Sequence, residues 1–107
     1  MEAIVILTSM PADDSAQRLA KQLVTTKIAA CVNIMAPCLS TYRWQGAVES
    51  ATEVPVLIKT QRCHYEAVER IIRACHPYTV PEIIALPVVA GLADYLGWIV
   101  TETTDDA

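Results

Sequence analysis

The chain has 107 residues, of which 53% are hydrophobic and 19% charged, and its formal net charge is −4. This length predicts one domain spanning residues 1–107, and the composition excludes intrinsic disorder. The eight basic residues form no cluster and no apolar run reaches the roughly 18 residues of a membrane-spanning helix, so we expect neither nucleic-acid nor membrane binding.

The first segment predicts a strand followed by a helix. Residues 3–8 are apolar and rich in β-branched side chains, which indicates a strand buried on both faces that ends before Pro11. Asp13 or Asp14 can cap the helix that follows. The apolar stripe of this helix repeats at helical spacing and consists of Ala16, Leu19, Ala20, Leu23 and Val24.

A long hairpin is predicted next. Residues 28–36 form a second strand, which is interrupted at Pro37 and resumes over 39–44. Gln45-Gly46 makes a two-residue turn, because glycine readily supplies the positive φ of such turns. The returning strand covers residues 47–60 and places Glu53 and Lys59 on one face.

The second half predicts a helix, a strand and a short last helix. The helix covers about 62–74 and ends at His76-Pro77, since the residue before proline disfavours helical geometry. A strand follows over 83–89. The last helix covers about 92–100 and is expected to bury Leu92, Tyr95, Leu96 and Ile99, before a polar tail over 102–107.

The element order is β-α-β-β-α-β with a terminal helix, which predicts an α+β, ferredoxin-like sandwich. The hairpin strand from Ala29 to Trp44 spans sixteen residues, roughly 50 Å when extended at about 3.3 Å per residue. A compact domain of this size is roughly 35 Å across, so the hairpin should protrude. Its apolar side chains and the surplus apolar surface predict burial against other copies of the chain.

Several short motifs resemble the CutA family of divalent-cation tolerance proteins, in the same order and over nearly the whole chain. They are residues 29–34 (AACVNI), 42–46 (YRWQG), Glu53, 59–60 (KT), 76–78 (HPY), 81–84 (PEII) and 95–98 (YLGW). The resemblance implies a homotrimer whose hairpins pair between subunits. It also implies a cytoplasmic protein connected with tolerance of copper and other divalent cations. Burial between subunits should make the protein thermostable.

A metal site is predicted at Cys75 and His76, because a thiol beside an imidazole is a ligand pair that suits copper. Some bacterial relatives carry a cysteine in the first strand and a His-His pair before Pro-Tyr, whereas this chain has Thr8 and Cys75-His76. Two ligands leave the ion undercoordinated, so we expect weak binding of copper or another divalent cation. Cys63-His64 is the next candidate. A structural role for Cys75 and His76 stays open.

A ligand-binding cleft between subunits is the second candidate site, formed by polar and aromatic residues of the resembling motifs. Its members are Tyr42, Trp44, Glu53, Lys59, Tyr78 and Glu82. A Lys-Glu pair ringed by aromatic side chains could bind a small anion, and an interface salt bridge is the structural alternative.

The sequence predicts a binding protein rather than an enzyme. The three glycines fit neither a P-loop nor a dinucleotide-binding fingerprint, and no nucleophile lies beside His76 in a known motif. The main hypothesis is a trimeric metal-response protein. The alternatives are a PII-like signalling module that binds a small molecule between subunits, and an undiscovered enzyme that uses Lys59, Glu53 and His76.

Overall fold

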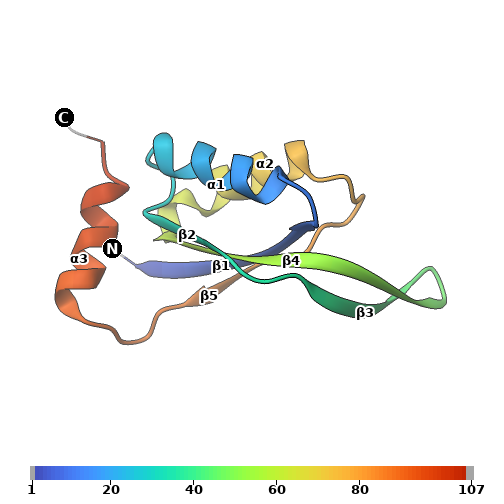
Figure 1. The fold of residues 1–107 in the computed structure, drawn as a ribbon. Helices are drawn as coiled ribbons and strands as arrows, with labels where there is room; N and C mark the ends of the chain where they lie inside the picture. The colour runs from blue at the N-terminus through green and yellow to red at the C-terminus, as the bar shows by residue number, and fades with distance from the viewer. Residues whose placement is uncertain (1, 106–107) are drawn as a thin grey trace.

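The structure is a computed structural model that describes residues 2–105. It is a mixed α+β fold with one antiparallel sheet and three α-helices (Figure 1). In chain order the elements are β1 (Ala3–Pro11), α1 (Ser15–Thr25), β2 (Cys31–Ile34), β3 (Cys38–Trp44), β4 (Ala47–Gln61), the 3₁₀ turn η1 (Arg62–His64), α2 (Tyr65–Cys75), β5 (Ile83–Pro87) and α3 (Ala93–Glu102). The predicted order of strands and helices is therefore confirmed.

The sheet has five strands in the order β2-β4-β1-β5, with β3 also paired to β4. Cys31 of β2 lies opposite Lys59, and Cys38 of β3 lies opposite Glu53. β2 and β3 thus follow one another along the same edge of β4, separated by the segment that contains Pro37. This confirms a single long strand interrupted at proline, where a ladder N–H is missing.

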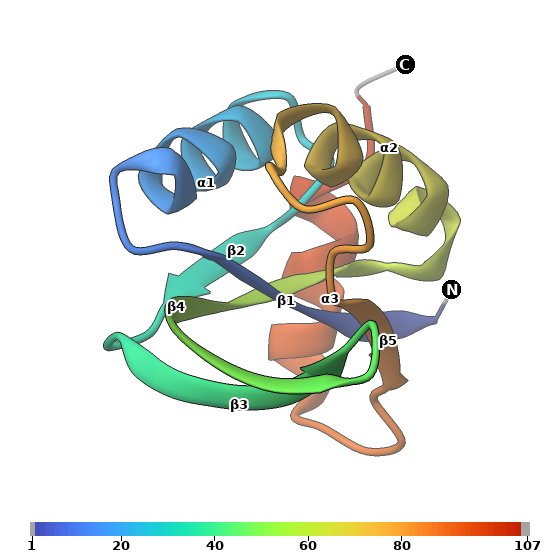
Figure 2. The ribbon, with the colours of Figure 1, turned by 90° about the vertical axis from the view of Figure 1, so that its right-hand side faces the viewer.

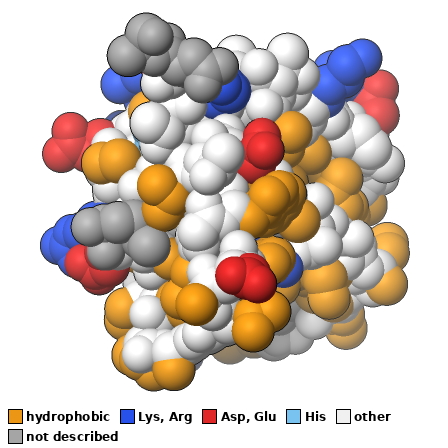
Figure 3. Space-filling view, turned by 90° about the vertical axis from the view of Figure 1, so that its left-hand side faces the viewer, with side chains coloured by type: hydrophobic (Ala, Val, Ile, Leu, Met, Phe, Trp, Pro, Cys, Tyr) orange, Lys and Arg blue, Asp and Glu red, His pale blue; other side chains and the backbone are white. Residues whose placement is uncertain are grey.

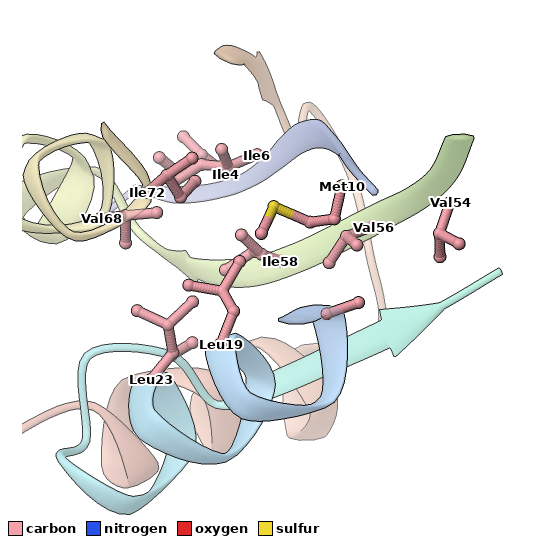
Figure 4. Close-up of a cluster of buried hydrophobic side chains, with 12 residues drawn as sticks. Ile4, Ile6, Met10, Leu19, Leu23, Val54, Val56, Ile58, Val68 and Ile72 are labelled. Carbon is pink, nitrogen blue, oxygen red and sulfur yellow. The ribbon is translucent and has the colours of Figure 1, made fainter. Parts of the chain in front are cut away.

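The main core lies between the sheet and the pair α1 and α2, which cover one of its faces (Figures 1 and 4). Side chains alternate along a strand, so every second residue of β1 points to these helices. Ile4 and Ile6 are 3% and 0% exposed, and Leu19, Leu23, Val68 and Ile72 meet them from the helices. The predicted stripe of α1 is thereby confirmed at Leu19 and Leu23, whereas Val24 at its end is 43% exposed.

The opposite face of the sheet is only partly covered. Val5 and Leu7 are half-buried, while Ile84 and Leu86 of the neighbouring strand are 48% and 50% exposed. α3 covers only one end of this face, through the buried Ile99. The prediction that β1 is buried on both faces is therefore wrong for a single copy. Hydrophobic side chains also reach the surface at the α3 end (Figure 3).

The hairpin β3–β4 projects beyond the rest of the molecule, as predicted (Figures 1 and 2). The longest axis measures 48 Å, against 26 and 23 Å for the other two. Gln45 and Gly46 have φ of 49° and 83°, so the two-residue turn has positive φ at both central positions. Leu39 and Val48 on this hairpin are 72% and 66% exposed.

The C-terminal region differs from the prediction. Leu92 precedes α3 and is 72% exposed, and Tyr95 is 38% exposed, because α3 contacts the sheet through Ile99 and Leu96 instead. The predicted polar tail begins inside α3, and its residue Thr103 is buried and accepts a hydrogen bond from Gln61 Nε2 at 2.9 Å. Residues 106–107 of that tail lie outside the described residues.

Candidate functional site

His76 is held by two backbone groups that lie far apart in the sequence. The residue follows the last residue of α2, has extended backbone geometry and is 9% exposed. The N–H of Tyr78 donates to Nδ1 at 3.1 Å, and Nε2 lies 2.7 Å from the carbonyl oxygen of Ser9. Because a backbone N–H can only donate, Nδ1 accepts and Nε2 carries the proton. Both nitrogens that could bind a metal are therefore occupied.

Cys75 is the last residue of α2, and its thiol donates to the carbonyl oxygen of Ile72 at 3.4 Å. Cys75 is exposed as a residue, but partial burial of its thiol raises the pKa above the usual value, and a hydrogen bond and the Arg18 charge oppose the shift only in part. Metals bind the thiolate, so a raised pKa disfavours coordination near neutral pH. The predicted end of the helix before His76-Pro77 is confirmed.

Thr8, which stands in place of the relatives' first-strand cysteine, and the second candidate pair, Cys63 and His64, also have protein partners or lie apart. Thr8 is fully buried, and its hydroxyl donates to the carbonyl oxygen of Glu82 at 2.7 Å. Cys63 is exposed, and His64 Nε2 lies 2.6 Å from the carbonyl oxygen of Thr103. Within residues 2–105, no three or more His, Cys, Asp or Glu side chains are grouped to hold a metal ion. The Cys75–His76 metal site stays a prediction, and this conformation contains no preformed centre.

Five of the six predicted cleft residues line one hollow. It is lined by the projecting hairpin and by the loop of residues 77–82 that joins α2 to β5, and it has a volume of about 890 Å³. The hairpin contributes Tyr42, Trp44 and Glu53, and the loop contributes Tyr78 and Glu82. The short motifs of the hairpin and of the loop therefore meet in space.

Lys59 does not line this hollow. Its ammonium lies 5.9 Å from the centre of the Tyr95 ring of α3, and Tyr95 stacks on Trp98. Lys59 and Glu53 do share a face of β4, but six residues separate them, which is roughly 20 Å along a strand. Within one copy, the predicted Lys-Glu pair is therefore not formed.

Two charged residues of the hollow, Arg43 and Glu49, were missed by the sequence analysis. The hairpin turn fixes the register of its strands, and Glu49 lies directly opposite Tyr42. Counting outward from Gln45-Gly46 could therefore have placed Glu49 beside the predicted aromatic residue.

The chain is similar to members of one protein family over nearly its whole length. Residues 4–102 match the model of the family described as CutA1 divalent ion tolerance protein. The chain belongs to this family. A CutA divalent-cation tolerance protein from Thermus thermophilus is 43% identical over 99 residues, covering 92% of this chain and 95% of that relative. The corresponding protein of Pectobacterium atrosepticum is also 43% identical, over 98 residues, covering 92% of this chain and 89% of that relative.

Solved CutA structures share the whole fold. CutA from Xylella fastidiosa has a TM-score of 0.92 and 40% identity, covering 97% of this chain and all of that chain (100%). CutA from Archaeoglobus fulgidus, described as a periplasmic divalent cation tolerance protein, has a TM-score of 0.91 and 37% identity, covering 95% and 99%. These names connect the CutA family with tolerance of divalent cations, and they do not favour the PII-like alternative. No helix among the described residues is long and apolar enough to cross a membrane.

Proposed function

We propose that this chain is a homotrimeric, cytoplasmic protein with a ferredoxin-like fold that contributes to tolerance of divalent cations, acting by binding rather than catalysis. Membership of the CutA1 family over residues 4–102 is the observation that carries this proposal. The strand order β2-β4-β1-β5, with α1 and α2 on one face, supports the ferredoxin-like arrangement. Four free cysteines are compatible with a reducing compartment.

Assembly is supported by the apolar surface that one copy leaves open. The exposed side chains lie on the hairpin, where Leu39 and Val48 are found, and on the sheet face that carries Ile84 and Leu86. Large apolar patches are rare on monomers and mark interaction surfaces. Burial in a homotrimer would add to each small core, which is the basis for proposing a thermostable protein.

We propose that copper or a similar divalent cation binds weakly at Cys75 and His76. Coordination by His76 has to displace the Tyr78 N–H from Nδ1 or break the bond from Nε2 to Ser9. Coordination by Cys75 has to remove a proton from a thiol whose pKa is raised by burial. Both costs lower the affinity, and the fold should form without metal because its core is built by other residues.

The test of the proposed function is growth of a bacterial strain that lacks its own CutA family member, in graded copper, zinc and cobalt. Expression of this chain should restore growth at inhibitory metal concentrations, and equal growth with and without it would contradict the proposal. Calorimetric titration with copper under controlled redox conditions tests the site separately. Cys75→Ser and His76→Ala should weaken binding, while Cys63→Ser, at an exposed thiol, should not.

A further inference from the structure

The loop of residues 77–82 is tied to β1 at both of its ends. At the end nearer α2, His76 Nε2 donates to the carbonyl oxygen of Ser9 at 2.7 Å. At the end nearer β5, the hydroxyl of Thr8 donates to the carbonyl oxygen of Glu82, also at 2.7 Å. Thr8 and Ser9 are adjacent, so the two ends of the loop are fixed to neighbouring positions of one strand.

Between these ends, Tyr78 holds the first half of the loop. Its backbone N–H donates to His76 Nδ1 at 3.1 Å, and the two rings pack with their centres 4.7 Å apart. Its phenol is hydrogen-bonded to Glu53 of β4, at the base of the projecting hairpin. Residues 77–80 are exposed in one copy, so packing within the subunit does little to hold them. Tyr78 therefore connects the imidazole of His76 with the hairpin.

The imidazole of His76 cannot bind a cation and keep the Tyr78 amide. A neutral imidazole has one ring nitrogen with a free lone pair, and here that nitrogen is Nδ1, which accepts the Tyr78 N–H. A cation at Nδ1 takes this lone pair directly. A cation at Nε2 displaces the proton from Nε2, and the one proton of the neutral imidazole then lies on Nδ1, facing the Tyr78 N–H. Either nitrogen as ligand leaves the Tyr78 amide without its acceptor.

We propose that the loop of residues 77–82 is a latch that opens when His76 binds a divalent cation. The Tyr78 amide moves away from the imidazole, while Thr8 keeps Glu82 in place. The phenol moves with its backbone, so its bond to Glu53 weakens and the change reaches the base of the hairpin. This inference rests on the cation site proposed above, and it adds that the bound and free states differ in the conformation of the loop. Because binding and opening are linked, weakening the closed loop strengthens binding.

Hydrogen exchange of the Tyr78 amide measures the state of the latch directly. The assembled, ¹⁵N-labelled protein is followed by NMR at neutral pH with and without zinc chloride, an ion that suits imidazole and thiolate ligands and has no redox chemistry. Exchange at Tyr78 should accelerate roughly tenfold or more at saturation, because the amide loses its hydrogen bond. The amide of Ile58, in the centre of β4, should be unchanged.

Two variants test the latch without any metal. His76→Asn keeps an acceptor oxygen on a side chain of similar reach, whereas His76→Ala removes the acceptor. In zinc-free buffer the Tyr78 amide should exchange faster in His76→Ala than in His76→Asn. Equal exchange in the two variants would show that the imidazole does not hold the loop, which overturns the proposal.

Tyr78→Phe tests the linkage with His76 intact. It removes the phenol bond to Glu53, so zinc should bind roughly threefold more tightly or better, since wild type has to weaken that bond on binding. Tyr95→Phe is the matched control, because it removes a hydroxyl of similar exposure on α3. Binding to Tyr78→Phe that is no tighter than binding to Tyr95→Phe contradicts the latch.

Calorimetric titration with zinc separates failure of the latch from failure of the cation site. Zinc binding that His76→Ala abolishes, together with unchanged Tyr78 exchange in wild type, overturns the latch and leaves the site in place. Absence of zinc binding, or binding that His76→Ala does not affect, also overturns the latch. The copper titration then decides the site alone.

Discussion

Tyr78 donates its backbone N–H to Nδ1 of His76, two residues earlier, and the same imidazole donates from Nε2 to Ser9 on β1. One side chain therefore ties the loop of residues 77–82 to the sheet. The rings of His76 and Tyr78 also pack with their centres 4.7 Å apart. This loop forms one wall of the hollow. His76 therefore helps to position lining residues, although it does not itself line the hollow.

The first prediction concerns His76→Ala, which leaves the Ser9 carbonyl and the Tyr78 N–H without their partner. Unsatisfied buried groups cost about 1–3 kcal/mol each, so the loss of both partners should lower the free energy of unfolding by roughly 2–6 kcal/mol. Urea unfolding followed by circular dichroism measures the change. Cys63→Ser, at an exposed thiol, should stay within about 0.5 kcal/mol of wild type. Equal stabilities of the two variants would show that the imidazole bonds contribute little.

Gly46→Ala and Gly97→Ala should have opposite effects. A Cβ meets no atom within 4 Å at either position, so only the backbone differs. Gly46 has a φ of 83°, where alanine costs roughly 1–2 kcal/mol, whereas Gly97 lies inside α3, where alanine stabilises by about 1 kcal/mol. Thermal unfolding of both variants at one protein concentration checks the signs. A stabilising Gly46→Ala would contradict the turn geometry.

Trp44→Ala should weaken assembly more than it disturbs secondary structure. Trp44 lies at the end of β3 on the projecting hairpin and is 40% exposed in one copy. Buried tryptophan is a common hot spot of interfaces. Sedimentation equilibrium should give three chains for wild type and smaller species for the variant, with similar circular dichroism. A folded wild-type monomer at micromolar concentration would rule out the proposed homotrimer.

The melting temperature should rise with protein concentration. Only folded chains associate with one another, so association stabilises the folded state by mass action. Differential scanning calorimetry over a hundredfold dilution series measures this dependence. A melting temperature that is constant across a reversible series would mean that folding is not coupled to assembly.

The pH dependence of Cys75 follows from its raised pKa. In the folded protein the thiol remains protonated at pH values where a free cysteine ionises, so its contribution to stability is complete below the usual pKa and is lost as pH rises through the raised value. Cys75 and Cys63 are both exposed residues, and iodoacetamide labelling followed by peptide mass spectrometry should show Cys75 reacting more slowly than Cys63 near pH 8. Equal rates at every pH would contradict the shift.

Local patterns predicted most of the elements correctly. The stripe containing Leu19 and Leu23 predicted α1, because helical spacing alone determines which side chains share a face. Gln45-Gly46 predicted the turn, because the conformation of a two-residue turn depends on those two residues alone. Leu92 was placed wrongly because burial at a helix end depends on where the helix docks, and α3 docks through Ile99.

The candidate site was predicted in part. Tyr42, Trp44 and Glu53 were assigned to one cleft with Tyr78 and Glu82, and the structure brings these five together. The residues were found through a family resemblance, and no spacing rule relates the hairpin to a loop some thirty residues later. The assignment of Lys59 to the same cleft failed within one copy, because a shared strand face does not imply proximity along the strand.

Spacing between near neighbours was enough to predict the alternation of the strands, the helical stripe of α1 and the turn. Family membership was also predictable, because whole motifs match in order. Contacts between distant segments could not be predicted in this way: His76 donates to Ser9, 67 positions away, and Lys59 lies over Tyr95 while Glu53 is buried further along the same strand. These contacts depend on which distant segments the sheet topology brings together, and no local rule contains that information.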